Sequence, residues 1–250
     1  MPLIFPDSLG WERFTTSDAG AIFEDYSTGM AEPLLSEFRE TTLPLGTSPA
    51  ERLKTFTDAV VAIALTLLIL PLLETVPDTI RANETAAQWV HASSNYLLSF
   101  LLSFVLITAF WHNHERIFEH VQRQTAPLRL VNSFWMLTIV FLPVPTALLG
   151  LQKTDATQYA LYLGTMLLSS LAINGLALLV ARDPRIVGRN PPLPARTLAS
   201  TFSATVLYAL TLILALNGVG YKAAFTLMLI PVLTPAMLRV VQRLKLISSP

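Results

Sequence analysis

Six long apolar stretches divide this sequence, at about residues 55–72, 91–111, 130–150, 157–181, 197–216 and 220–238. A helix needs roughly 20 mostly apolar residues, at about 1.5 Å each, to cross the hydrocarbon core of a bilayer. Only 14% of the residues are charged, whereas a typical soluble domain has about 25%. The chain is therefore predicted to be an all-α integral membrane protein with six transmembrane helices.

The basic residues between the stretches predict the orientation of the chain. Three of the connections, those between the first and second, third and fourth, and fifth and sixth stretches, hold one basic residue each: Arg81, Lys153 and Lys222. The other 14 of the 17 lysines and arginines lie on the opposite side of the predicted membrane. Because lysine and arginine accumulate in cytoplasmic segments, we expect both termini to be cytoplasmic.

The first 48 residues differ from the rest of the chain, with four prolines and scattered acidic residues in place of a long apolar run. We expect residues 1–48 to be a mostly irregular cytoplasmic tail and residues 49–247 to form the six-helix domain. The formal net charge of zero gives no reason to expect a nucleic-acid partner.

Sequence motifs of soluble enzymes are missing. The chain has no cysteine, and it has no nucleophile elbow, zinc-protease motif, phosphate loop or dinucleotide fingerprint. His112 and His114 are two residues apart, so they do not share a helix face and do not predict a metal pair. We therefore expect no enzyme activity, no cofactor and no metal site.

The motif Val219-Gly220-Tyr221 lies between the fifth and sixth stretches, where six-span potassium channels carry a TVGYG filter. That filter requires a re-entrant loop with its own pore helix. Only a few residues separate the two stretches here, so the motif is interpreted as part of a tight turn.

The first stretch carries two kinds of residue on different sides. At 100° per residue on a helix, Ile63, Leu67 and Leu70 form one apolar stripe with Thr66 beside it. Asp58 lies about 140° from Ile63 by the same rule. The stripe either packs against lipid and other helices or faces an axis shared with other copies of the chain.

A carboxylate in a membrane helix is costly, about 2.5–3.5 kcal/mol on insertion scales, so Asp58 should have a partner or a purpose. One interpretation is a structural ion pair or hydrogen bond, with Arg52, His114 or Arg116 as candidate partners. The other is a titrating group that carries protons.

The segment Arg52-Leu53-Lys54-Thr55-Phe56-Thr57-Asp58 resembles the RxxxFSD signature of the transmembrane protein 175 family of endolysosomal and bacterial potassium channels. Trp111 with His114 and Arg116 resembles the family's WxxHHR segment, and FLPVPTALLG resembles its third-helix motif FxPFPTxLxG. The resemblance covers about residues 50–245. Two positions depart from the pattern, because Thr57 replaces a serine and Glu115 stands in place of a second histidine.

The resemblance implies a potassium-permeable cation channel, a homotetramer in which the first helices line the pore without a re-entrant filter loop. Ile63, Leu67 and Leu70 would form a hydrophobic constriction that acts as a gate, and Thr66 a polar layer associated with potassium selectivity. Its ligands would be K⁺ and other monovalent cations, and its partners the bilayer and other copies of itself. A single six-helix repeat per chain favours a bacterial plasma membrane. The network implied to hold the first helix consists of Arg52, Phe56, Thr57, Asp58, Trp111, His114 and Arg116.

The residues are also compatible with two other functions. A proton- or sodium-coupled secondary transporter would use Asp58 as its carrier and predicts a second acidic residue near the midplane, but the other five stretches contain none between their ends. A non-conducting membrane adaptor would depend on the tail at residues 1–48 and would tolerate substitutions of Ile63.

Overall fold

The computed structural model describes residues 48–151 and 155–244. The regular structure of these residues is helical, and six segments are long and apolar enough to cross a membrane. The predicted all-α membrane fold with six spans is therefore confirmed. The tail predicted for residues 1–48 lies outside the described residues except for Ser48.

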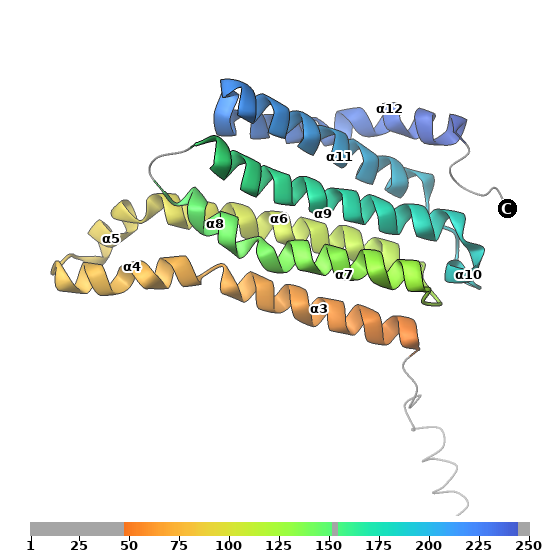
Figure 1. Cartoon of the computed structure of the whole chain (residues 1–250), viewed down its shortest axis with the longest axis horizontal. Helices are drawn as coiled ribbons and strands as arrows, with labels where there is room; N and C mark the ends of the chain where they lie inside the picture. Colours follow the sequence, from red (N-terminus) through yellow and green to blue (C-terminus); the bar gives the residue numbers. More distant parts are fainter. Residues whose placement is uncertain (1–47, 152–154, 245–250) are drawn as a thin grey trace, which may run out of the picture. The chain divides into compact units, whose positions relative to one another are not determined.

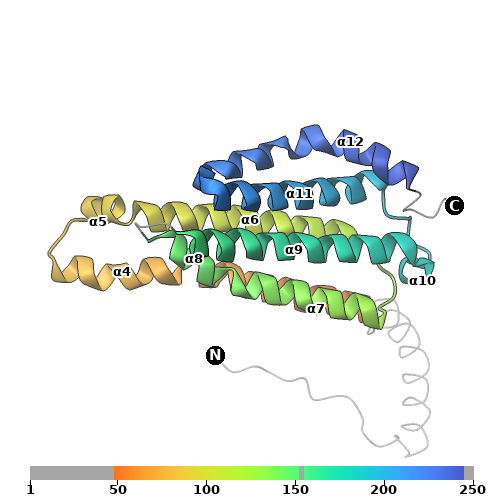
Figure 2. The same cartoon turned by 45° about the horizontal axis from the view of Figure 1, so that its top comes forward.

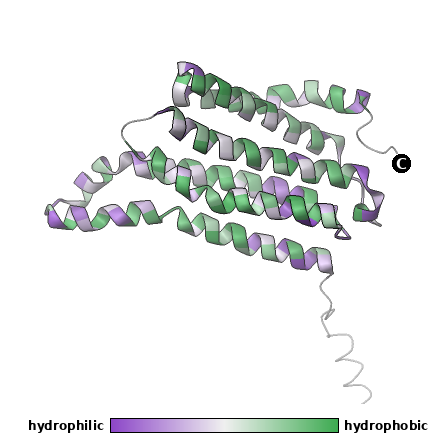
Figure 3. Ribbon diagram, viewed as in Figure 1, coloured by the Kyte–Doolittle hydropathy of each residue, from purple (hydrophilic) through white to green (hydrophobic). Residues whose placement is uncertain are grey.

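The long helices run side by side in a bundle (Figure 1), and they stay alongside one another after rotation, where α7 lies in front of α3 (Figure 2). Apolar residues cover the lengths of the helices, and hydrophilic residues gather near the helix ends and in α4 (Figure 3). The elements are α3 (Pro49–Leu67), α4 (Leu70–Arg81), α5 (Ala86–Ala92), α6 (Ser94–Phe118), α7 (Ala126–Phe141), α8 (Pro143–Leu149), α9 (Ala156–Arg182), α10 (Pro184–Val187), α11 (Ala195–Leu214), the π-helical turn η1 (Ala215–Val219), the 3₁₀-helix η2 (Gly220–Leu229) and α12 (Ile230–Arg243).

Several helices have a side-chain cap at their N-terminus. Ser48 and Glu51 form a reciprocal capping box at the start of α3, with Pro49 in the first turn. Asp155 accepts a hydrogen bond of 2.8 Å from the backbone N–H of Gln158 at the start of α9. Such caps satisfy N–H groups that have no partner inside the helix.

The first span differs from its prediction in length and shape. It was expected over residues 55–72, but helix extends over Pro49–Arg81 with a break at Leu68 and Ile69. Pro71 explains the break, because proline lacks the N–H that would bond to the carbonyl four residues earlier and its ring clashes with that carbonyl. Leu70 therefore begins α4 and is not on the same helix as Ile63.

Prolines also stand at changes of helix geometry in two further spans. The third span breaks between α7 and α8, where Pro143 begins α8. The sixth changes from 3₁₀ to α-helix at Ile230, next to Pro231. Gly218 and Gly220 adopt positive φ angles of 94° and 63° in the connection between the fifth and sixth spans, so a short turn joins them.

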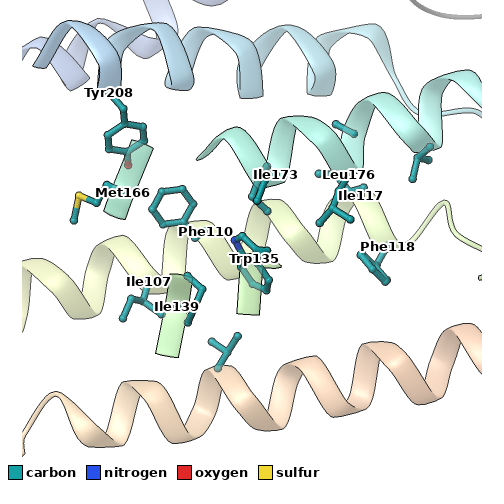
Figure 4. Close-up of a cluster of buried hydrophobic side chains, with 14 of the residues drawn as sticks. Ile107, Phe110, Ile117, Phe118, Trp135, Ile139, Met166, Ile173, Leu176 and Tyr208 are labelled. Carbon is teal, nitrogen blue, oxygen red and sulfur yellow. The ribbon is translucent and has the colours of Figure 1, made fainter. Parts of the chain in front are cut away.

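The hydrophobic core lies between α6, α7, α9 and α11, and α9 is the most enclosed of the membrane-length helices. Trp135 from α7 lies beside side chains of α6 and α9 (Figure 4), and it is fully buried. On α6, Phe110 stacks on Tyr208 of α11 with ring centroids 5.6 Å apart. This packing holds the central helices together.

Buried hydroxyl groups join the same helices. Thr146 of α8 donates a hydrogen bond of 2.8 Å to the Ser103 hydroxyl of α6. Ser103 is also 3.0 Å from the Tyr162 hydroxyl of α9. Because hydrocarbon offers no alternative partner, these contacts satisfy each other and fix how the helices are aligned.

Candidate pore helix

Helix α3 has a buried face and an exposed face within the described part of the chain. Thr57, Val61, Ala64 and Leu68 recur every three or four residues and are at most 2% exposed. They pack α3 against α6 and α7, which lie beside it. The first helix is thus held by one side only.

The predicted stripe lies on the other side of this helix. Ile63 is 59% exposed and Leu67 is 37% exposed, while Leu70 at the start of α4 is 47% exposed. Phe56, two turns before Ile63, is on the same side and is also 59% exposed. The described residues leave this row of large apolar side chains uncovered.

Thr66 adds a polar group next to the stripe. Its hydroxyl donates a hydrogen bond of 2.7 Å to the carbonyl of Ile63, one turn earlier, and its side chain is exposed. Because the proton is engaged with the backbone, the lone pairs of Oγ1 point away from the helix. An outward hydroxyl oxygen of this kind is a weak ligand for a cation.

A directed chain of hydrogen bonds anchors the buried face. Asn132 of α7 donates from Nδ2 to the Thr57 hydroxyl over 2.9 Å, and Thr57 donates to the carbonyl of Leu53 over 2.8 Å. The amide oxygen of Asn132 must then face His114 of α6, whose Nε2 lies 2.7 Å from it. His114 therefore carries its hydrogen on Nε2 and donates it to Asn132.

The ring of His114 is also enclosed by aromatic residues. It lies between Trp135, with centroids 4.4 Å apart, and Phe118, with centroids 4.1 Å apart, and both pairs are stacked. His114 has no exposed surface. The histidine is thus a structural junction between α3, α6 and α7.

The partner of Asp58 is none of the three proposed residues, Arg52, His114 and Arg116. Trp111 donates from Nε1 to the Asp58 carboxylate over 2.9 Å. The two ion pairs in the described part of the chain are Lys54–Glu115 and Arg81–Asp78, and neither includes Asp58. The structure thus gives Asp58 a structural partner, which is the neutral indole of Trp111.

The ion pair between Lys54 and Glu115 adds a further link from α3 to α6, with an N–O distance of 3.3 Å. Glu115 is the residue that departs from the resemblance at this corner. Its position explains the departure physically, because a carboxylate here meets a lysine from the first helix.

Three residues assigned to the network lie apart from it. The Arg52 and Phe56 side chains are exposed, and the Arg52 guanidinium makes no hydrogen bond to another described residue. Arg116 is two residues beyond His114, so it lies on nearly the opposite side of α6. It faces a pocket formed with α11 and α12.

Sequence reasoning also misplaced or missed parts of this site. The segment around His114 was expected beyond the second span, but it lies inside α6, which continues to Phe118. Asn132 was missed, although an asparagine inside an apolar span is itself a signal of a buried polar contact. His112 bonds to the carbonyl of Thr108 in its own helix over 3.0 Å.

The fold and this site define an integral membrane protein in which one face of the first helix is anchored and the other is not covered by any described residue. Residues 52–143 match the family model described as endosomal/lysosomal potassium channel TMEM175. These residues include both motifs on α3 and α6, so the resemblance indicated by the sequence is confirmed.

Individual relatives each match about two fifths to half of the chain. A potassium channel of Chamaesiphon minutus is 34% identical over 103 residues, which is 41% of this chain and 50% of that protein. A potassium channel of Streptomyces collinus is 29% identical over 126 residues, which is 49% of this chain and 59% of that protein. The human endosomal/lysosomal proton channel TMEM175 is 30% identical over 104 residues, 42% of this chain and 20% of that protein. The match thus spans half or somewhat more of the bacterial relatives and a fifth of the human one.

One solved structure shares the fold over a larger part of the chain. The crystal structure of a lysosomal potassium-selective channel TMEM175 homologue from Chamaesiphon minutus superposes with a TM-score of 0.58 at 24% identity. The superposition covers 76% of this chain and 97% of that one. The six-span arrangement is therefore the same overall fold.

Proposed function

We propose that this protein is a potassium-permeable cation channel of the transmembrane protein 175 type. Four copies of α3 surround a central pore, and both termini are cytoplasmic. The observation that carries the proposal is the exposed face of α3, because a helix anchored on one side presents Ile63 and Leu67 to something outside the subunit. The matched bacterial relatives are named potassium channels.

The physical basis of the gate is the drying of a narrow apolar ring. Four Ile63 side chains around one axis leave no polar surface for water, so hydrated ions are blocked until the ring widens. Thr66 supplies the only hydroxyl on this face between Ile63 and Leu70. Selectivity from such weak ligands and from dehydration should be modest compared with a filter of backbone carbonyls.

The orientation of the helices is consistent with the charge pattern. The start of α3, the end of α6 and the end of α9 lie at the same end of the bundle (Figures 1 and 2). Arginines concentrate there: Arg116 and Arg182 lie in the last turns of α6 and α9, Arg185 in α10 and Arg196 in the first turn of α11. By the positive-inside rule this end is cytoplasmic.

The transporter and adaptor interpretations have less support. Asp58 accepts a hydrogen bond from Trp111 where α3 packs on α6. This contact fixes the carboxylate, whereas a transporter would need it to bind and release ions. The adaptor interpretation depends on residues outside the described part of the chain.

The test is ion flux into proteoliposomes that contain the purified full chain. We expect wild type to pass potassium faster than sodium, and Ile63→Asn to raise the flux and reduce the preference. Ile213→Asn is the matched control, because Ile213 on α11 is 57% exposed, nearly the same as Ile63. Proton flux is recorded in parallel, since some relatives are named proton channels.

The control separates the pore from general effects of a polar residue in the membrane. If both variants change flux equally, α3 does not line the pore. If folded tetrameric wild type passes neither potassium nor sodium, the channel proposal fails.

A further inference from the structure

A pocket of about 640 Å³ lies between α6, α11 and α12, away from the anchored face of α3. Arg116 enters it from the last turn of α6, and Arg196 from the first turn of α11. Both arginines therefore stand where apolar helices reach the membrane surface. This pocket has no part in the proposed pore.

The two arginines have no anionic partner in the part of the chain that the structure describes. Neither guanidinium is in an ion pair or a side-chain hydrogen bond with another described residue, since the ion pairs there involve Lys54 and Arg81. Residues 112–129, 182–196 and 239–244 together hold nine arginines but only three acidic residues, Glu115, Glu119 and Asp183. Glu115 is already paired with Lys54.

The same pocket offers neutral hydrogen-bond donors. Thr197 and Ser200 of α11 line it, three residues apart on one side of the helix. Their hydroxyls make no hydrogen bond to another residue within the described ranges. One guanidinium group from α6, and a second with two hydroxyls from α11, form a donor set suited to a phosphate group.

The opposite wall is apolar and follows the direction of the membrane-crossing helix. It is formed by α12 with Ile230, Pro231, Pro235 and Leu238, and with Thr234, whose hydroxyl donates to the carbonyl of Ile230. A ligand that fills the pocket thus meets cationic donors near the membrane surface and hydrocarbon toward the midplane.

We propose that this pocket binds an anionic phospholipid. The phosphate of the headgroup is held by Arg116 and Arg196, and an acyl chain lies along α12 between Leu238 and Ile230. Charge complementarity selects an anionic lipid, and the apolar wall selects a lipid over a free phosphate. Lipid binding at this pocket does not depend on ion conduction. It gives a role to Arg116, which takes no part in the hydrogen bonds around His114.

The test measures thermal unfolding of the detergent-purified full chain with added phosphatidylglycerol or phosphatidylcholine. We expect phosphatidylglycerol to raise the unfolding midpoint by about 3 °C or more beyond phosphatidylcholine, because a ligand that binds only the folded state stabilises it. The double variant R116Q/R196Q should lose at least half of this shift. Arg185→Gln should keep it, because Arg185 is an exposed arginine of the same end but outside the pocket.

Two results would overturn the proposal. Equal shifts of the unfolding midpoint in wild type, R116Q/R196Q and Arg185→Gln would show that phosphatidylglycerol binds through the overall positive charge at this end of the bundle and not through the pocket. An equal shift with water-soluble glycerol phosphate would show that the pocket takes a free phosphate. If the double variant does not fold, Arg196→Gln alone is compared with Arg185→Gln by counting retained lipids in native mass spectrometry. Equal retention then contradicts the proposal.

Discussion

At the residue scale, the first helix is held by side chains that point away from its exposed stripe. Thr57 reaches Asn132, and Asn132 reaches His114, so three helices share one set of donors and acceptors. Each of these hydrogen bonds pairs a donor that would have no partner in hydrocarbon. The rigid position of Ile63 on the opposite side depends on this arrangement.

Asn132→Leu should destabilise the folded protein more than any substitution of an exposed asparagine. It leaves the buried Nε2–H of His114 without an acceptor, which costs about 1–3 kcal/mol. The matched control is Asn95→Leu, because Asn95 is exposed on α6 and its side chain makes no hydrogen bond to a described residue. Reversible unfolding in mixed micelles measures both, and equal stabilities would show that the chain of hydrogen bonds contributes little.

At the element scale, one glycine permits a close approach of two spans. Gly150 follows α8, and a Cβ atom placed there would overlap the ring of Tyr96 on α6. Gly164 on α9 has open space around the same position. The two glycines therefore make a matched pair.

Gly150→Ala should lower the free energy of unfolding by about 1–3 kcal/mol, because the Tyr96 ring must move. Gly164→Ala should raise it by about 0.5–1 kcal/mol, since alanine restricts the unfolded chain and favours helix. The comparison uses the same unfolding measurement. A loss of stability in Gly164→Ala equal to that in Gly150→Ala would contradict the assigned contact.

The break in the first span is a second feature of this scale. With no native cysteine in the chain, spin labels can be attached at Ala62→Cys and Ile80→Cys, two exposed positions on either side of the break. A straight helix would separate these positions by about 27 Å. Pro71→Ala restores the missing N–H and should lengthen the label distance toward that value.

Pro77→Ala is the control for this measurement, because Pro77 lies inside α4 without interrupting it. It should change the distance much less than Pro71→Ala. An unchanged distance in Pro71→Ala would instead show that the packing of Leu68 and Leu72 sets the bend.

At the scale of the whole molecule, the six spans could be predicted because hydropathy adds up over about 20 residues. The ends of the spans could not be predicted in this way, as α6 shows. The polar segment around His114 looks like a loop, yet its buried positions continue the helical period and pack His114, Ile117 and Phe118 into the core. Only the tertiary partners reveal that this segment is helix within the bundle.

Part of the candidate site could likewise be predicted from the sequence, and part could not. The exposed stripe at Ile63 and Leu67 follows from the helical period, which needs no knowledge of other elements. The partners of the buried face do not, because Thr57 and Asn132 are 75 residues apart and Asp58 and Trp111 are 53 apart. Charge complementarity favoured arginine for Asp58, whereas the packing of α3 on α6 brings an indole N–H to it.

The central claim for the assembled molecule is that Ile63 from several copies meets on the conduction path. Cysteine at this position would place several thiolates around one axis, and thiolates bind soft metal ions such as Cd²⁺. We predict that Cd²⁺ blocks potassium flux through Ile63→Cys and leaves wild type and Ile213→Cys unaffected. Potassium flux through Ile63→Cys that persists in Cd²⁺, with the thiol shown to react in the membrane, would contradict a pore lined by the first helix.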